Sequence, residues 1–200
     1  MRIFEVGFPD GPSIRAGLKG DEDFHRVEYP DVEEFLMDRR LDYYSDADAM
    51  IFFPQCKTFS LAALGHHWSK ISDGHFEPKT DAAVLSLVML KRFEKIIQNA
   101  EPKKWMLENP QGMISFFWEL GELSKITHCQ YGSERQKPTY IYSNFEWNPK
   151  PPCKRGSPCH VAAPRGSLTG TQKRKRKDRA KLPLELQQAL VLAIENEANK

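Results

Sequence analysis

The sequence predicts an α/β fold in which a helix connects two strands of a mainly parallel sheet. Two short apolar runs, residues 50–53 and 105–107, flank a segment after Thr80 whose apolar side chains recur at helical spacing. Short apolar runs bounded by turn residues suit buried strands, and the order strand, helix, strand produces a parallel pair. With 200 residues and 40% hydrophobic content, the chain can bury one substantial core.

The first apolar run ends at Pro54, so Cys56 should follow the carboxyl end of a strand. Asp81 lies close to the expected amino-terminal cap of the next helix, which should extend for about four to five turns. The second run leads directly into Glu108, and a further helix is predicted over residues 111–120. Because ligands of open parallel sheets bind beyond the carboxyl ends of the strands, Cys56 and Glu108 should converge there.

The second half of the chain has a different pattern. Residues 126–131 and 139–142 are β-prone and flank a turn, which predicts an antiparallel appendage. Residues 144–181 are rich in Pro, Gly, Ser and basic side chains, which predicts a long loop or a small irregular region. We therefore expect an α/β core over residues 1–143, this irregular basic region, and a C-terminal helix within residues 182–200 that packs on the core.

The charge distribution makes nucleic acid a candidate partner. The net charge is only +2, but residues 173–181 form a strongly basic run, which either contacts phosphates or is a solvated linker. No run reaches the roughly 18 apolar residues of a membrane-spanning helix, and the amino terminus lacks a secretory pattern. With 4 cysteines, we expect a cytoplasmic protein with reduced thiols and no membrane partner.

Cys56 and Glu108 carry the residue types that cytosine chemistry needs. A thiolate can add to C6 of cytosine and so activate C5, and a carboxyl group beside the base can bond its exocyclic amine and share a proton with N3. Each residue also has an ordinary structural interpretation. Cys56 could be a small buried side chain, and Glu108 could be a surface acid at the end of a strand.

A series of short motifs runs through roughly residues 46–195. The motifs are FPQCKTFS at 53–60, GHHW at 65–68, WMLENP at 105–110, CQYG at 129–132, RQKPT at 135–139, CH at 159–160, APRGS at 163–167 and TGTQ at 169–172. In content, order and spacing they resemble DNA cytosine C5 methyltransferases, especially small viral-type members of that family.

The resemblance implies a Rossmann-like methyltransferase sheet, with residues 144–181 as a small target-recognition region. It implies that a cytosine is flipped out of double-stranded DNA, that Cys56 adds to C6, that Glu108 recognises the base, and that C5 receives a methyl group from S-adenosylmethionine. Arg135 would organise the active site, although it could also be a solvated turn charge. The expected compartment is a prokaryotic or virus-infected cytoplasm. The expected DNA contacts are Lys57, Ser60, Lys137, Arg165, Lys173, Arg174, Lys175 and Arg176.

The sequence departs from the family pattern on the cofactor side, where the sheet is reduced at its amino terminus. Residues 2–6 suit the first strand, but the loop at 7–12 contains bulky and proline residues in place of a small glycine turn. Too few residues precede Asp31 for the usual strand, helix and second strand, so the ribose-binding unit is expected to be missing, with Glu28 a candidate substitute for its acid. The cofactor-side candidates are Glu5, Gly11, Asp31 and Pro54. Gln55 stands where the family usually has proline.

These departures leave alternatives open. The chain could be an active enzyme, completed by a second subunit at the cofactor site, or a catalytically inactive DNA-binding or regulatory relative. RNA or a free nucleotide could replace DNA as the substrate.

Cys153, Cys159 and His160, with Cys129 or His128, supply ligand types suited to tetrahedral zinc. Their spacing is not a standard zinc signature, so we expect no metal and keep a zinc site as the alternative. For His66 and His67, the alternatives are the active site and a surface pair, and Trp68 should serve packing.

Overall fold

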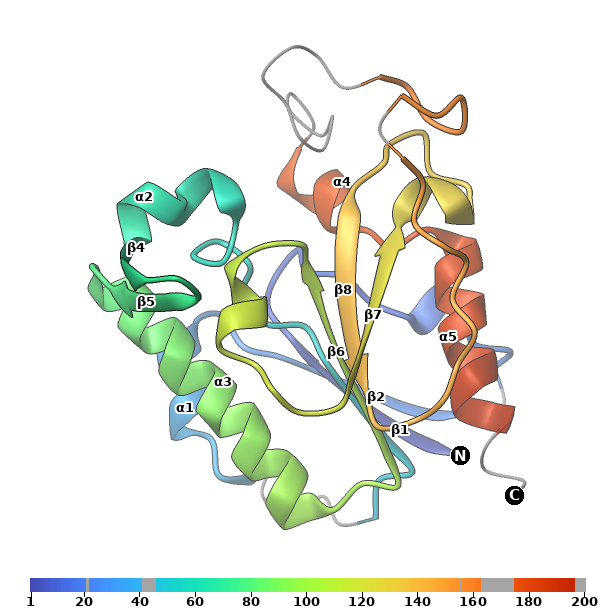
Figure 1. Cartoon of the computed structure of the whole chain (residues 1–200). Coiled ribbons are helices and arrows are strands. Elements are labelled where there is room, and N and C mark those ends of the chain that lie inside the picture. Colours follow the sequence, from blue (N-terminus) through green and yellow to red (C-terminus); the bar gives the residue numbers. More distant parts are fainter. Residues whose placement is uncertain (21, 41–45, 155, 163–174, 197–200) are drawn as a thin grey trace.

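The protein is an α/β structure with one mixed six-stranded sheet and helices on both of its faces (Figure 1). The computed structural model describes residues 1–20, 22–40, 46–154, 156–162 and 175–196. The strands are arranged in the order β2-β1-β3-β6-β8-β7, and β4 and β5 form a separate small hairpin.

Four parallel strands form one half of the sheet. They are β1 (Arg2–Gly7), β2 (Asp23–Glu28), β3 (Ala49–Phe52) and β6 (Lys104–Pro110). β3 is buried along its whole length, and β6 is buried as far as Asn109. This burial explains why each strand could be predicted from a continuous apolar run. The predicted strand, helix, strand order is confirmed.

The other half of the sheet is antiparallel. β8 (Pro138–Ser143) pairs with β6 on one side and with β7 (Glu122–Thr127) on the other. The predicted antiparallel pairing is confirmed, but these two strands are not an appendage, because they extend the main sheet. The β-prone segment 126–131 was also placed too late, since β7 ends at Thr127 and a 3-10 helix, η5 (His128–Tyr131), follows it.

Two helices cover one face of the sheet. The predicted helix is α3 (Asp81–Ala100), and its cap is Thr80, whose hydroxyl accepts a hydrogen bond from the backbone N–H of Ala83. The shorter α1 (Val32–Met37) packs beside α3, and the ring of Phe35 in α1 lies 4.7 Å from the ring of Phe93 in α3. The ring of Phe93 also lies 4.9 Å from the ring of Phe52 in β3. Aromatic packing thus joins both helices to the strand that leads into Cys56.

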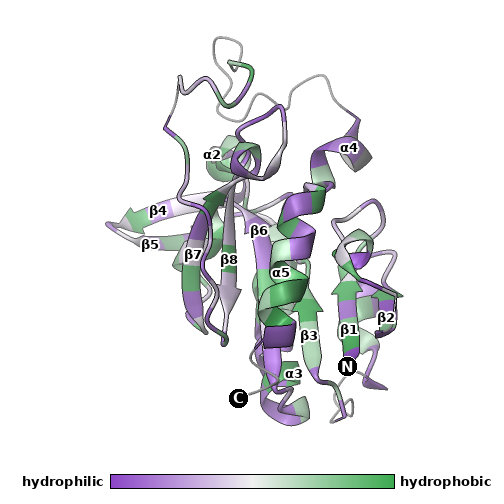
Figure 2. Ribbon diagram, turned by 90° about the vertical axis from the view of Figure 1, so that its right-hand side faces the viewer, coloured by the Kyte–Doolittle hydropathy of each residue, from purple (hydrophilic) through white to green (hydrophobic). Residues whose placement is uncertain are grey.

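The opposite face is covered by α5 (Leu184–Asn196), which confirms the predicted C-terminal helix. Figure 2 shows α5 lying against the strands on this side. Its buried residues pack with Ile3, Ile51 and Met106, one from each of β1, β3 and β6. A short helix, α4 (Arg176–Ala180), precedes it.

The connection from β1 to β2 contains only a 3-10 helix, η1 (Arg15–Gly17). The ribose-binding unit was expected to be missing, but its second strand is present, because all six residues of β2 pair in parallel with β1. What is reduced is the connecting helix. α5 lies in its place, and its backbone approaches η1 so closely that a Cβ on Gly17 would lie 2.5 Å from the carbonyl carbon of Gln187.

The remaining elements lie between β3 and α3 and after β6. The first group consists of η3 (Leu61–Ala63), α2 (Leu64–His67) and the β4 (Trp68–Ser72) and β5 (His75–Pro78) hairpin. After β6, only the 3-10 helix η4 (Met113–Phe116) forms where residues 111–120 were predicted to be helical. That prediction is wrong because Gly112 forms a bridge with Ser60, and the N–H of Met113 bonds Phe59 O at 2.7 Å.

No helix in the described ranges is long and apolar enough to cross a membrane.

Replacing Leu190 with alanine should destabilise the fold, because this fully buried side chain on α5 fills the core beside the parallel strands. We expect a loss of about 2–5 kcal/mol in the free energy of unfolding, measured by urea denaturation. Leu192→Ala on the same helix is the matched control, since Leu192 is 50% exposed, and should change stability by only about 0.5 kcal/mol. Equal effects would contradict the assigned orientation of α5.

Candidate functional site

Cys56 and Glu108 come from neighbouring parallel strands that end at the same edge of the sheet. In the register of β3 and β6, Phe52 lies opposite Leu107, so the chain leaves β3 beside Glu108. Cys56 follows in an exposed turn, whereas Glu108 is buried. The expected placement of both residues at the carboxyl ends of adjacent strands is confirmed.

Hydrogen bonds attach the Cys56 loop to the end of β6. The side-chain amide of Asn109 donates to Pro54 O at 3.4 Å, and Met113 N donates to Phe59 O. Within the loop, Ser60 N donates to Cys56 O at 3.1 Å. The position of Cys56 relative to Glu108 is therefore set by contacts on both sides of the loop.

Aromatic packing supports the Cys56 loop on its buried side. The buried ring of Phe59 stacks on Trp68 at 6.0 Å, and Trp68 Nε1 donates to Thr58 O at 2.8 Å. The expected packing role of Trp68 is confirmed. His67 is buried with its Nδ1 2.7 Å from Thr80 Oγ1, while its neighbour His66 is exposed, so the two are not a surface pair.

Glu108 is a buried carboxyl group with spare hydrogen-bonding capacity. It is 2% exposed, and its Oε1 has no hydrogen-bond partner within the described residues. Burial raises the pKa of Glu108 to about 7, and the positive charge of Lys137 opposes part of that rise. The interpretation of Glu108 as a surface acid is wrong, because the side chain lies inside the fold.

Two further polar atoms near this edge are buried without a hydrogen-bond partner in the part of the chain that the structure describes. They are Oδ1 of Asn109 and Nε of Arg135. Buried polar atoms are normally satisfied, so such atoms often mark a place where another molecule binds. Asn109 was not singled out from the sequence, where it stood only as the fifth residue of the motif at 105–110.

Arg135 and Lys137 belong to the turn between η5 and β8. They line a narrow cleft of about 30 Å³ together with His128, Ser133, Asp178, Arg179 and Lys181. The cleft is predominantly basic, and it is lined both by this turn and by α4. A wider open cleft of about 600 Å³ adjoins it, between the turn at Tyr131–Glu134 and the start of α5.

The other residues predicted to contact DNA are spread over the structure. Lys57 is exposed directly after Cys56, and Ser60 caps η3 through a bond from Ala62 N. Lys175 is exposed before α4, which begins at Arg176. Arg165, Lys173 and Arg174 lie outside the described residues.

The predicted cofactor side is occupied by interactions within the protein. Both carboxylate oxygens of Glu5 are used, by Arg26 on one side and by Ser13 Oγ and Ile14 N on the other. Arg26 also donates to Pro12 O and to Glu28, and its guanidinium lies 3.6 Å from where a Cβ of Gly7 would be. Glu28 does end β2, where a ribose-binding acid was expected, but its carboxylate is paired with Arg26.

The other cofactor-side candidates have structural roles or no assigned contact. Gly11 closes a tight turn in which its N–H bonds Phe8 O at 2.9 Å, and a Cβ there would lie 2.7 Å from that oxygen. Asp31 caps α1 by accepting from Glu34 N. Pro54 is buried beside β6. Residues 7–12 therefore form a tight turn closed by Gly11 rather than a small glycine turn.

A cluster of metal-ligating side chains lies beyond β7. Cys129, Cys153, Cys159 and His160 place their ligand atoms within 4.8 Å of one another. From the sequence no metal was expected, and the alternative was a zinc site on Cys153, Cys159 and His160 with Cys129 or His128. The cluster contains Cys129.

No protein-family model matches the chain, and no curated protein matches it.

Glu108 should make the stability of the protein depend on pH. Because its pKa is about 7 in the folded protein and 4.5 in the reference state, the buried group stays protonated while the unfolded chain ionises, so stability falls as pH rises from 4.5 to 7. The loss should be at most about 3 kcal/mol. Glu108→Gln should remove this component, as measured by denaturant unfolding across the pH range. The exposed Glu122→Gln is the control, and parallel pH profiles of wild type and Glu108→Gln would contradict the assignment.

Proposed function

We propose that this chain is a DNA cytosine C5 methyltransferase-like protein, with a Rossmann-like sheet, that binds a flipped cytosine between Cys56 and Glu108. The observation that carries the proposal is the placement of an exposed thiol in the loop after β3 and of a buried carboxyl group, whose pKa is raised to about 7, on the neighbouring strand β6. A strongly shifted pKa at the carboxyl edge of parallel strands is typical of a catalytic group.

The protonation behaviour of Glu108 fits the edge of cytosine. A neutral carboxyl group offers one donor and one acceptor, and cytosine presents an acceptor at N3 beside the donor amine on C4. The unpartnered Oε1 of Glu108 supplies an acceptor that such an amine would satisfy. With a pKa of about 7, Glu108 can also release its proton near neutral pH.

These groups support a covalent step on the ring. The thiolate of Cys56 forms a bond to C6, and the C5–C6 π electrons shift along the conjugated C5–C4–N3 system. N3 then takes the proton of Glu108. C5 then carries the electron density needed to accept an electrophile. Such attack requires a base outside the stack, because neither face of C6 is accessible to a side chain within a duplex.

The basic cleft beside the site supports double-stranded DNA as the partner. Arg135, Lys137, Arg179 and Lys181 line it with only one acid, Asp178. Cationic side chains at this position would bind the phosphates that flank a flipped nucleotide. We assign Arg135 to holding the base or its phosphate, because its buried Nε has no partner among the described residues.

The cofactor side favours a second candidate function. The methyl donor that the family uses is S-adenosylmethionine, and Arg26 occupies the acids and the loop backbone where it would bind. This supports a catalytically inactive DNA-binding or regulatory relative, or one subunit of a split enzyme whose partner supplies the donor. No methyl-transfer step is therefore derived from this chain alone.

Exchange of the C5 hydrogen of cytosine tests the base-side chemistry without a methyl donor. Once Cys56 has added to C6, C5 takes a proton from solvent, the original hydrogen leaves C5, and the thiolate is expelled. We expect the protein to release tritium from DNA that contains 5-tritiated cytosine. Cys56→Ala should abolish the release, and Glu108→Gln should slow it about 10²- to 10⁴-fold. The control Glu122→Gln should match the wild type.

RNA and a cytidine nucleotide, tested in parallel, define the substrate, and faster release from either would contradict the assignment of DNA. DNA binding without tritium release would favour the inactive relative. Adding labelled S-adenosylmethionine to the same reactions tests the donor side, where we expect no methylation by the isolated chain. Methylated cytosine would show instead that Arg26 yields to the cofactor.

A further inference from the structure

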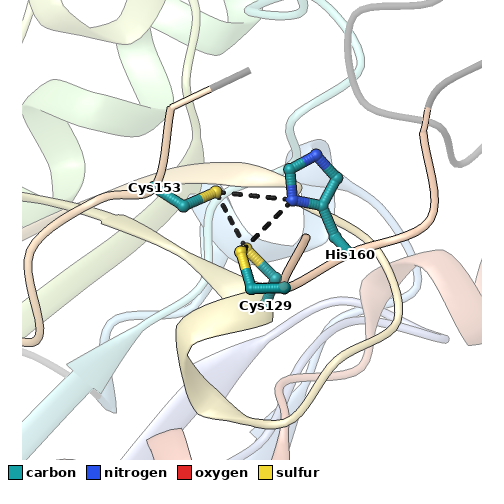
Figure 3. A group of neighbouring side chains, drawn as sticks. Cys129, Cys153 and His160 are labelled. Carbon is teal, nitrogen blue, oxygen red and sulfur yellow. Dashed lines mark hydrogen bonds between the residues drawn. The ribbon is translucent and has the colours of Figure 1, made fainter. Parts of the chain in front are cut away.

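Four metal-ligating residues from two separate segments meet beyond the end of β7. Cys129 lies in η5, Cys153 lies in the segment after β8, and Cys159 and His160 follow it. Their ligand atoms all lie within 4.8 Å of one another. Figure 3 shows the side chains of Cys129, Cys153 and His160 pointing toward a common centre.

The distances suit a tetrahedral ion. Zinc lies about 2.3 Å from a thiolate and about 2.0–2.1 Å from an imidazole nitrogen, so a tetrahedral site separates two sulfurs by ~3.8 Å and a sulfur from a nitrogen by ~3.6 Å. The cluster has Cys159 Sγ 3.7 Å from Cys129 Sγ, and His160 Nδ1 3.6 Å from Cys153 Sγ and 3.4 Å from Cys159 Sγ. The Cys129–Cys153 pair, at 3.0 Å, is closer than this geometry requires.

The donor set selects the kind of ion. Three sulfurs and one imidazole are soft to borderline ligands, which bind zinc and do not suit magnesium or calcium. A disulfide would use only two of the three cysteines and would leave the third sulfur and the imidazole beside it. The four ligands fill a tetrahedral shell, which is typical of a structural zinc site and leaves no position for a substrate.

Surrounding groups support the ligands. Gln136 Nε2 donates to Cys153 Sγ at 3.3 Å and to Cys153 O at 3.1 Å. Cys153 N donates to Thr127 Oγ1 at 3.0 Å, and Gln130 Nε2 lies 3.7 Å from Cys159 Sγ. Donors to sulfur stabilise the thiolate form and hold each ligand in position, as outer-shell groups of metal sites do.

We propose that Cys129, Cys153, Cys159 and His160 bind one structural zinc ion. The ion would attach residues 153–160 to the end of β7. Between Phe145 and Val161, no helix or strand forms among the described residues, so this stretch has no regular backbone pairing of its own. A metal crosslink provides the stability that a short irregular segment cannot draw from a core.

The site has a consequence for the neighbouring turn. Gln136 lies between Arg135 and Lys137, and Val161 N donates to Glu134 O at 2.9 Å, so the metal-bound segment contacts the turn at both ends. Zinc would thereby hold the basic side of the cleft in place. The metal site itself does not depend on the proposed cytosine chemistry, because its ligands lie outside the Cys56 and Glu108 pair.

Metal analysis of the full chain tests the proposal. Protein produced in zinc-containing medium and purified without chelator should contain about one zinc per chain by inductively coupled plasma mass spectrometry. Replacement by cobalt should produce the intense visible bands and sulfur charge-transfer absorption of a tetrahedral thiolate site. Cys153→Ser and His160→Ala should each lose most of the bound zinc. Cys56→Ser is the matched control, since it removes the cysteine outside the cluster, and should retain the metal.

Three results would overturn the zinc assignment. They are a metal-free wild-type protein that also gives no tetrahedral cobalt spectrum, iron as the metal that copurifies, and equal loss of metal from Cys56→Ser. A Cys129–Cys153 disulfide, detected by mass spectrometry in protein kept under reducing conditions, would overturn it as well. If the ligand variants do not fold, the cobalt spectrum of the wild-type chain decides. Retained tritium release with no bound metal would reject zinc alone and leave the proposed function intact.

Discussion

Parallel pairing of β3 with β6 is the interaction on which the arrangement of the candidate site depends. Because Phe52 lies opposite Leu107, the loop that carries Cys56 leaves β3 beside Glu108. A register shift of a single position would turn Glu108 to the other face of the sheet. The hydrogen bond from Asn109 to Pro54 and the bridge between Ser60 and Gly112 then connect the loop to the same strand.

The edge of the sheet combines a well-packed support with incompletely satisfied polar groups. Phe59 and Trp68 are almost fully buried beneath the loop, so little rearrangement is available there. Directly beside them, Glu108 and Asn109 each retain a buried oxygen without a partner among the described residues. Consecutive residues with this property reduce stability, and proteins concentrate such costs where a ligand is bound. On the cofactor side, by contrast, both carboxylate oxygens of the buried Glu5 accept hydrogen bonds from neighbouring groups.

Local sequence pattern was sufficient for the elements whose burial is uniform or strictly periodic, namely β3, β6, α3 and α5. It failed for β2, an edge strand in which four of the six residues are polar or charged. No apolar run marks this strand in the sequence, and its pairing with β1 is visible only in the structure. It also failed for residues 111–120, where the contact of Gly112 with the Phe59 backbone replaces helical bonding.

The same distinction applies to the sites. Cys56 and Glu108 followed from strand ends, which are local features, whereas the role of Arg26 depends on acids from two strands and on the loop at Pro12. The metal cluster depends on Cys129, which is distant in sequence from the other three ligands. Spacing within residues 153–160 carries no information about that contact.

The position of α5 has a consequence for how the molecule folds. This helix covers strands from the first 110 residues of the sequence, and the hydrogen bond from Ala16 N to Gln187 Oε1 joins residues 171 positions apart. Contacts of such separation require a large loop to close before they contribute, which slows folding. Until α5 docks, Ile3, Ile51 and Met106 remain uncovered on one side of the sheet. During synthesis, the nascent sheet therefore presents an apolar surface that is vulnerable to aggregation until the last helix has emerged from the ribosome.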